Sequence, residues 1–168
     1  MNVILKPIDE RNREAVLALS VRDDQPFVAD NRRSLEQAAA YEQEAPGSVR
    51  PFAVFAEGRP VGFAMLVIDP HARDPFDRYS LWRLMIDRHE QNKGYGQAAM
   101  AQIIRYFRNR GADRVLLSTV PENEAGLHVF GKFGFAATGE MNEDEAVLSL
   151  DLTAALNIRL NTIISRTV

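Results

Sequence analysis

Residues 79–96, YSLWRLMIDRHEQNKGYG, join an apolar run, a polar loop with two glycines and the start of a helical pattern. The first N–H groups of a helix have no partner within it, and the helix dipole adds partial positive charge there. Gly94 and Gly96 would let the backbone approach an anion without a side chain in the way, and Lys93 adds a cation. The segment predicts phosphate binding. The alternative is that the glycines only ease a tight turn.

Two common phosphate-binding motifs do not fit this segment. A P-loop places Gly-Lys-Ser/Thr before its helix, whereas the order here is Lys-Gly-Tyr-Gly. A dinucleotide fingerprint needs a third glycine, but position 99 is alanine and the spacing already differs. A nucleotide-binding protein without transferase activity is therefore disfavoured by the motif order.

The loop needs a strand before it and a helix after it. Apolar residues on both faces of Tyr79–Ile86 predict a central strand. The four-residue spacing of Ala99, Ile103 and Phe107 predicts a helix over Gly94–Arg110. The other predicted elements are strands at Val3–Ile8, Phe52–Ala56, Val61–Ile68, Val115–Val120, Phe135–Glu140 and Ala146–Leu152, and helices at Arg11–Val21, Ser34–Glu44 (with Ser34 as N-cap) and Asn123–Phe133. This order predicts an α/β (α+β) fold with a mixed sheet.

Length and composition limit the classes of protein that are possible. The 168 residues suit one domain, and the net charge of −3 argues against a nucleic-acid partner. No apolar run approaches the ~20 residues that span a bilayer, so no membrane partner is expected. The start of the chain does not read as a signal peptide, and cysteine is absent, so we expect a cytoplasmic protein without disulfides or a cysteine nucleophile.

Acidic residues gather near the end of the predicted sheet. Residues 137–151 hold five Asp or Glu and no Lys or Arg. One interpretation is a solvated turn. The other is a negative surface that attracts a cationic ligand.

Two segments together resemble a known family. Gln91-Asn92-Lys93-Gly94-Tyr95-Gly96 matches the Gln/Arg-x-x-Gly-x-Gly/Ala signature of the GNAT N-acetyltransferases, and it follows a strand as in that family. Downstream, Asn123-x-x-Gly126-x-x-x-Phe130-x-x-Phe133-Gly134-Phe135 is similar to the family's Asn-x-x-Ala-x-x-x-Tyr-x-x-x-Gly-Phe segment. The resemblance covers roughly residues 3–152. It implies a single GNAT domain over 1–152, with about seven strands and four helices, and a tail over 153–168 that packs on the domain or on a partner chain.

A narrower resemblance concerns the acceptor. The segments 25–31, 82–87 and 91–96 are similar to bacterial diamine and spermine/spermidine acetyltransferases. The function this implies is transfer of an acetyl group from acetyl-CoA to a primary amine, by direct attack in a ternary complex. The acceptor would be a diamine or polyamine. The alternatives are a protein N-terminus, an aminoglycoside, an amino acid, or a non-catalytic acyl-CoA-binding module; a homodimer is possible.

The family resemblance assigns the donor site residue by residue. Acetyl-CoA would lie in a V-shaped opening between the strands at Tyr79–Ile86 and Val115–Val120, and no metal is implied. A backbone N–H near Leu84 would stabilise the oxyanion that forms during transfer. The implied cofactor-binding residues are Leu84, Met85, Ile86, Gln91, Asn92, Lys93, Gly94, Tyr95, Gly96, Asn123 and Phe130.

Phe130 departs from the family pattern. The family commonly has a tyrosine there, whose hydroxyl protonates the departing CoA thiolate. Asn123 and Phe130 are seven residues apart and share a helix face, so the Phe130 ring is expected at the site without a proton to give. Tyr79 and Tyr95 are candidate replacements. His128 is expected to face elsewhere, about 200° around the helix from Phe130.

The acceptor side is less defined by the sequence. A primary ammonium titrates near ~10, so a base must accept its proton before attack. The candidates are Glu122, Glu140 and Glu145, among which the sequence does not choose. The predicted substrate-binding residues are Asp23, Asp24, Trp82 and Glu145.

Overall fold

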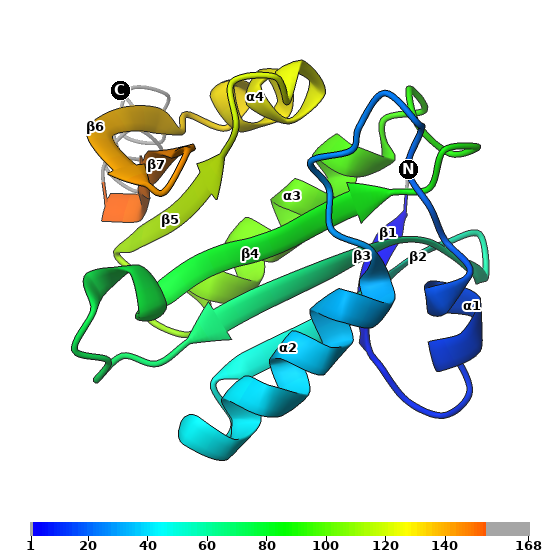
Figure 1. Cartoon of the computed structure of the whole chain (residues 1–168), viewed down its shortest axis with the longest axis horizontal. Helices are drawn as coiled ribbons and strands as arrows, with labels where there is room; N and C mark the ends of the chain where they lie inside the picture. Colours follow the sequence, from blue (N-terminus) through cyan, green and yellow to red (C-terminus); the bar gives the residue numbers. More distant parts are fainter. Residues whose placement is uncertain (1, 154–168) are drawn as a thin grey trace, which may run out of the picture.

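A computed structural model describes residues 2–153 of the chain, and its core is one seven-stranded sheet (Figure 1). The strands lie in the order β1-β2-β3-β4-β5-β7-β6, and only β4 and β5 are parallel neighbours. The bounds are β1 Val3–Pro7, α1 Arg13–Leu17, α2 Asn31–Glu44, β2 Val49–Ala56, β3 Arg59–Ile68, a 3-10 turn at Pro75–Asp77, β4 Tyr79–Ile86, α3 Tyr95–Arg108, β5 Arg114–Thr119, α4 Glu124–Lys132, β6 Ala136–Asn142 and β7 Glu145–Asp151. The predicted mixed sheet with four helices is confirmed.

Helices cover both faces of the sheet and bury two separate apolar clusters. Successive residues of β3 point to opposite faces, so Phe63, Met65 and Val67 belong to the cluster that includes Val16 of α1 and Leu35 of α2. Their neighbours Ala64, Leu66 and Ile68 belong to the cluster that includes Ile103 and Phe107 of α3. The central strands are therefore buried on both sides, as their apolar sequences predict.

A β-bulge interrupts the pairing of β3 with β4. Met65 lies opposite Arg83 and Leu66 opposite Leu81, so Trp82 is the extra residue on β4. Consecutive strand residues normally point to opposite faces, but a bulge redirects side chains. Both Trp82 and Arg83 accordingly contact α2: the Trp82 ring meets Tyr41 edge-on at 5.1 Å, and Arg83 Nη2 donates to Gln37 Oε1 at 2.9 Å.

The first predicted helix is shorter than expected. The prediction was Arg11–Val21, whereas α1 is only Arg13–Leu17. The chain leaves the helix to bind the segment after β4: Ser20 N–H donates to Asp87 Oδ2 at 3.0 Å, and Arg88 N–H donates to Ser20 O at 2.7 Å. These long-range contacts replace the next helical turn.

The second helix begins earlier than predicted. Asp30, not Ser34, is its N-cap, since the Asp30 carboxylate accepts the Arg33 N–H at 2.8 Å. Ser34 lies within the first turn, and its hydroxyl donates to Asp30 O at 2.9 Å. Strand β4 has the predicted bounds, and α3 begins at Tyr95 because Gly94, with φ of 84°, caps it.

The predicted tail lies outside the described residues except for Thr153. Within residues 2–153, no helix combines the length and the apolar character that a bilayer crossing requires.

Candidate active site

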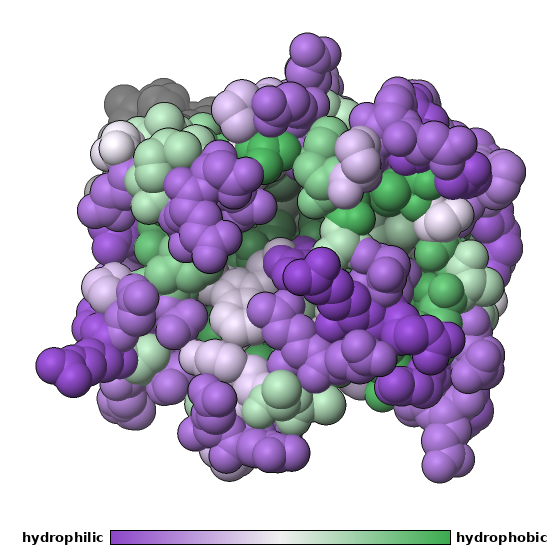
Figure 2. Space-filling view, in the orientation of Figure 1, coloured by the Kyte–Doolittle hydropathy of each residue, from purple (hydrophilic) through white to green (hydrophobic). Residues whose placement is uncertain are grey.

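The two parallel strands at the centre of the sheet separate soon after they meet. β4 and β5 pair in register at Ser80 and Leu116, and two adjoining cavities then fill the wedge between them and the N-terminal loop, residues 18–30 between α1 and α2. The helix-side cavity, at the N-terminus of α3, has a volume of about 410 Å³, and the hairpin-side cavity, beside the start of β7, about 150 Å³. Figure 2 shows the hollow in this face, with an apolar floor and a hydrophilic rim. Both cavities are lined by Val28, Leu84, Met85, Asn123 and Phe130.

The predicted phosphate loop forms one wall of the helix-side cavity. Gln91, Asn92, Gly94 and Gly96 line it, and Asn92 and Gly94 adopt positive φ of 62° and 84°. The Gln91 side chain holds the loop in place, since its Nε2 donates to Ile86 O at 3.0 Å and to Gln25 Oε1 at 2.7 Å. Glycine before a 14-residue helix leaves backbone N–H groups open to an anion, so this wall fits a pyrophosphate.

Two residues of this loop do not line the cavity. Lys93 Nζ donates to Glu90 Oε2 at 3.0 Å, and Arg59, the first residue of β3, pairs with Glu90 Oε1 at 2.6 Å. The hydrogen bond from Arg59, followed by that from Lys93, holds the pKa of Glu90 below its usual range. The Tyr95 side chain is buried in the core on the α3 side.

Asn123 lies where the two cavities meet. It is the N-cap of α4: its Oδ1 accepts the Gly126 N–H at 3.1 Å, while its Nδ2 donates to Thr119 Oγ1 at 3.0 Å. Phe130, two turns further along α4, is buried and lines both cavities as well. Its ring packs edge-on against Phe135, with 6.0 Å between ring centroids. The structure thus brings Asn123 and Phe130 together at this junction.

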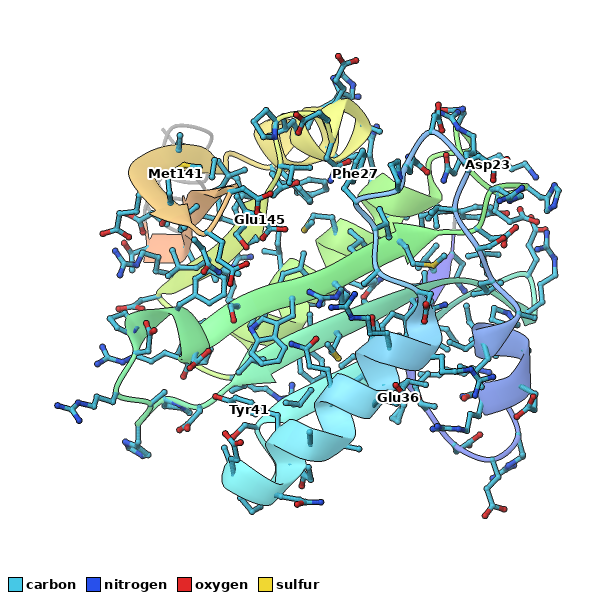
Figure 3. The ribbon with its side chains drawn as sticks, viewed as in Figure 1. Asp23, Phe27, Glu36, Tyr41, Met141 and Glu145 are labelled. Atoms are coloured by element: carbon cyan, nitrogen blue, oxygen red, sulfur yellow. The ribbon has the colours of Figure 1, made fainter. Side chains whose placement is uncertain are left out.

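The hairpin-side cavity carries the polar groups of the acceptor side. Among the described residues that line it, only Arg83 and Glu145 are charged. The Ser118 hydroxyl of β5 donates to Glu145 Oε2, across from Phe27 of the N-terminal loop (Figure 3). Burial lowers the pKa of Arg83 and the Glu145 carboxylate opposes that shift. Trp82, a predicted substrate-binding residue, lines the same cavity.

Asn31 also lines the hairpin-side cavity. Its Nδ2 donates to Val16 O at 2.8 Å, which fixes the orientation of the amide. Its Oδ1 is buried without a hydrogen-bond partner among residues 2–153.

The predicted carboxylates are not brought together. Asp23 pairs with Arg88 and Asp24 with Arg22, each at 2.9 Å, on the exposed N-terminal loop. In Figure 3, Asp23 lies on the far side of Phe27 from Glu145. Glu122 and Glu140 are exposed and line neither cavity. The acidic segment therefore contributes Glu145 alone to the hairpin-side cavity.

Tyr79 is also remote from the junction. It begins β4, at the end of the strand opposite the loop, and its hydroxyl donates to Arg110 O at 3.2 Å. Its ring packs against Phe107. Neither Tyr79 nor Tyr95 lines either cavity, so neither hydroxyl takes the place of the one that Phe130 lacks.

Several cavity residues had no role in the sequence analysis. Arg83 was detectable as the one charged residue within the apolar run of β4. Ser118 gave no signal, and Asn31 appeared only as the last residue of the resembling segment 25–31, because their cavity positions depend on packing between distant elements. The expectation for His128 was wrong: it lines the helix-side cavity, which spans more of the α4 surface than the face shared by Asn123 and Phe130.

Comparison with known proteins identifies the class. The profile of the Acetyltransferase (GNAT) family matches residues 15–135, well over half of the chain. The chain therefore belongs to the GNAT acetyltransferase family, whose members use acetyl-CoA, and it is an enzyme of the N-acetyltransferase class. Two relatives are each 27% identical to this chain over 146 residues, which cover 84% of this chain and 93% of each relative. They are a probable spermine N(1)-acetyltransferase from Bacillus subtilis subsp. natto and a spermine/spermidine N(1)-acetyltransferase from Bacillus subtilis strain 168.

Solved structures share the fold. The PaiA N-acetyltransferase of Thermoplasma acidophilum, in complex with coenzyme A, superposes with a TM-score of 0.65 at 13% identity and covers 90% of this chain and 99% of its own. A chimera of the spermidine N-acetyltransferase SpeG of Vibrio cholerae with hSSAT gives a TM-score of 0.66 at 18% identity, over 92% of this chain and 98% of its own.

Proposed function

We propose that this enzyme transfers the acetyl group of acetyl-CoA to a primary amine by direct attack in a ternary complex, and that the acceptor is a diamine or polyamine. The observation that carries the proposal is the meeting of the two cavities at Leu84, Met85, Asn123 and Phe130. A donor in one cavity and an acceptor in the other would come into contact at that junction.

The donor side is built for a long ligand with a charged end. Gly94 and Gly96 keep the N-terminus of α3 free of side chains, and Asn123 presents an amide at the far end of the same cavity. Acetyl-CoA supplies an activated acetyl thioester when it is bound. The chain's own contribution is to hold the pyrophosphate on backbone N–H groups and to direct the arm toward the junction.

Glu145 is the carboxylate that supports the acceptor chemistry best. Of the three candidate bases it alone lines the hairpin-side cavity, and Ser118 fixes one of its oxygens. An ammonium bound there would give its proton to the carboxylate. The amine nitrogen would then form a C–N bond to the acetyl carbon as the C–S bond breaks, and the second proton that the nitrogen must lose to become an amide would pass to solvent. Because Phe130 has no hydroxyl, the thiolate would leave without help from that residue and take a proton from water; its pKa near ~8.5 makes this feasible.

The relatives support a polyamine acceptor. Both Bacillus relatives are named as spermine or spermine/spermidine acetyltransferases, and their similarity extends over most of this chain. A carboxylate in the hairpin-side cavity can bind an ammonium through a charge-assisted hydrogen bond.

The test is acetyl-CoA turnover, followed by release of free thiol, with butylamine, putrescine, spermidine, a peptide N-terminus, an aminoglycoside and amino acids. We expect the diamine and the polyamine to have the highest kcat/KM. Glu145→Gln should raise the amine KM or lower kcat by tenfold or more, while Glu140→Gln on the exposed β6 should not. Equal turnover of butylamine and putrescine would refute the polyamine acceptor, and no turnover with any amine would refute the transferase mechanism.

A further inference from the structure

The walls of the helix-side cavity carry few groups that can hold a charge. Of the described residues that line it, only Glu90 and His128 have side chains that ionise. Arg59 and Lys93 each hold one carboxylate oxygen of Glu90, and neither of these cations lines the cavity. Acetyl-CoA carries a pyrophosphate and a 3′-phosphate. On the described walls, this anionic ligand would therefore meet one carboxylate and no arginine or lysine.

His128 is the lining side chain that can become a cation. It lies on α4, exposed to solvent at the edge of the cavity, whereas the phosphate loop forms another wall of the same cavity. Histidine is the side chain whose charge ordinarily changes between pH 5 and 8. In its cationic form both ring nitrogens donate, and a hydrogen bond between two charged groups is about twice as strong as a neutral one.

The other charged groups around His128 do not form a lasting partner for it. On α4, Glu124 and Lys132 lie four residues to either side, and both are exposed and of opposite sign, so their effects on the ring oppose each other. Glu90 lines the same cavity, but its two ion pairs offset its charge. The N-terminal loop, β4 and the first turn of α3 present only neutral described side chains to the cavity. A bound phosphate would be the largest charge brought to the ring.

We propose that His128 is a cofactor-binding residue whose protonated ring donates a hydrogen bond to a phosphate oxygen of acetyl-CoA. The inference rests on the position of the donor in the proposed function. The contribution of His128 to affinity is complete where the ring is protonated, and it is lost as the pH rises through the range in which histidine gives up its proton. Because an anion favours the charged form of a neighbouring base, binding near neutral pH draws a proton from the buffer onto the ring.

Calorimetry of acetyl-CoA binding at two pH values tests the inference. His128→Gln should bind about tenfold more weakly than wild type at about pH 5.5 and equally well at about pH 8, since only a protonated ring contributes. His128→Lys, with its fixed charge, should bind more tightly than wild type at the higher pH. Titrations near pH 7 in buffers of different ionisation enthalpy count the protons taken up on binding, and His128→Gln should take up fewer than wild type. A merely structural role of the ring would not change this count.

His89→Gln is the matched control. His89 is an exposed histidine beside Glu90 that lines neither cavity, so its removal should leave both the Kd and the proton count unchanged. Acetyl-CoA without its 3′-phosphate identifies the partner of the ring: an effect that persists assigns the pyrophosphate, and one that disappears assigns the 3′-phosphate.

Two results would count against different claims. If His128→Gln matches wild type in Kd at both pH values and in proton count, the inference is wrong, while the donor site stands. If the wild type fails to bind acetyl-CoA at either pH, the donor site and the proposed function are wrong as well. His128→Lys keeps the test decisive if glutamine disturbs α4, because a lysine that leaves the affinity at about pH 8 unchanged would also overturn the inference.

Discussion

Asn123 and Gly126 fit together so closely that any Cβ at position 126 would force the Asn123 side chain to move. The Asn123 side-chain oxygen accepts the Gly126 N–H at 3.1 Å, and a Cβ built on Gly126 would overlap the Asn123 amide group. The family segment that this stretch resembles commonly has alanine at this position, so the cap is tighter here. The position of Asn123, at the junction of the two cavities, depends on that missing methyl group.

Gly126→Ala should therefore disturb both folding and binding. The Asn123 side chain must move and lose its bonds to Gly126 and Thr119, which costs about 1 kcal/mol for a lost N-cap. Gly131→Ala on the same helix is the control, because its Cβ meets nothing within 4 Å and alanine favours helix by up to about 1 kcal/mol. Urea unfolding should show opposite signs for the two variants. Equal stability of the two would contradict the packing described here.

A substitution at Gly94 tests the phosphate loop, and a control at Gly111 separates the effect of backbone strain on stability from the effect of a new side chain on acetyl-CoA binding. Gly94 and Gly111 have φ of 84° and 81°, so alanine at either site should cost roughly 1–2 kcal/mol of stability. Gly111 flanks the other end of α3, away from both cavities. Calorimetry should show weaker acetyl-CoA binding for Gly94→Ala only, and Lys93→Ala should have a smaller effect, since Lys93 does not line the cavity and its charge is paired with Glu90. Equal losses in Gly94→Ala and Gly111→Ala would exclude a direct role for the loop.

Phe130→Tyr tests how the thiolate leaves. A hydroxyl added at the junction of the cavities should keep or raise kcat, because it supplies the proton donor that this chain lacks. Phe130→Ala should act through packing, with a loss of about 3 kcal/mol or more for a truncated buried ring. Steady-state kinetics at saturating acetyl-CoA is the measurement. A folded but inactive Phe130→Tyr would show that the ring has another role.

Glu90 should make the loop sensitive to acid. Its pKa is depressed in the folded state, so its ion pairs with Arg59 and Lys93 contribute stability above the unfolded-state pKa of about 4.3. That contribution is lost as the pH falls through the lower folded-state pKa. Thermal unfolding should therefore show Glu90→Gln less stable than wild type near pH 6, with the gap closing below about pH 4. Glu36→Gln, on the exposed face of α2, should show no such gap.

The central strand, the helix after the loop and the order of the elements could be predicted because their signals are local. Apolar residues on both faces of β4 and the four-residue spacing in α3 depend only on near neighbours in the chain. The wrong end of α1 has the opposite cause: Ser20 leaves the helix to bind Asp87, which is 67 residues away.

The acceptor side could not be predicted for the same reason. The number of acidic residues favours the whole segment 137–151 as a surface for a cationic ligand. Of its acidic residues only Glu145 lines the hairpin-side cavity, since β6 is exposed throughout. Arg83 reaches it through a bulge that depends on how β3 and β4 pair. Neither the register of two strands nor the direction of a hairpin side chain is encoded in residue spacing alone.

The narrow joint between β4 and β5 also bears on how the molecule opens. One registered pair links an antiparallel group of four strands to the group β5-β7-β6, so little backbone pairing crosses the joint. Amide hydrogens of β5 and β7 should exchange together, through a partial opening that costs less than global unfolding. A ligand in the wedge would contact both groups of strands and hold them together. At a concentration of about 100 times its Kd, it would raise the free energy of this opening by about 2.7 kcal/mol. The joint between β4 and β5, where the least backbone pairing crosses the sheet, is thus also the joint that substrate binding would stabilise.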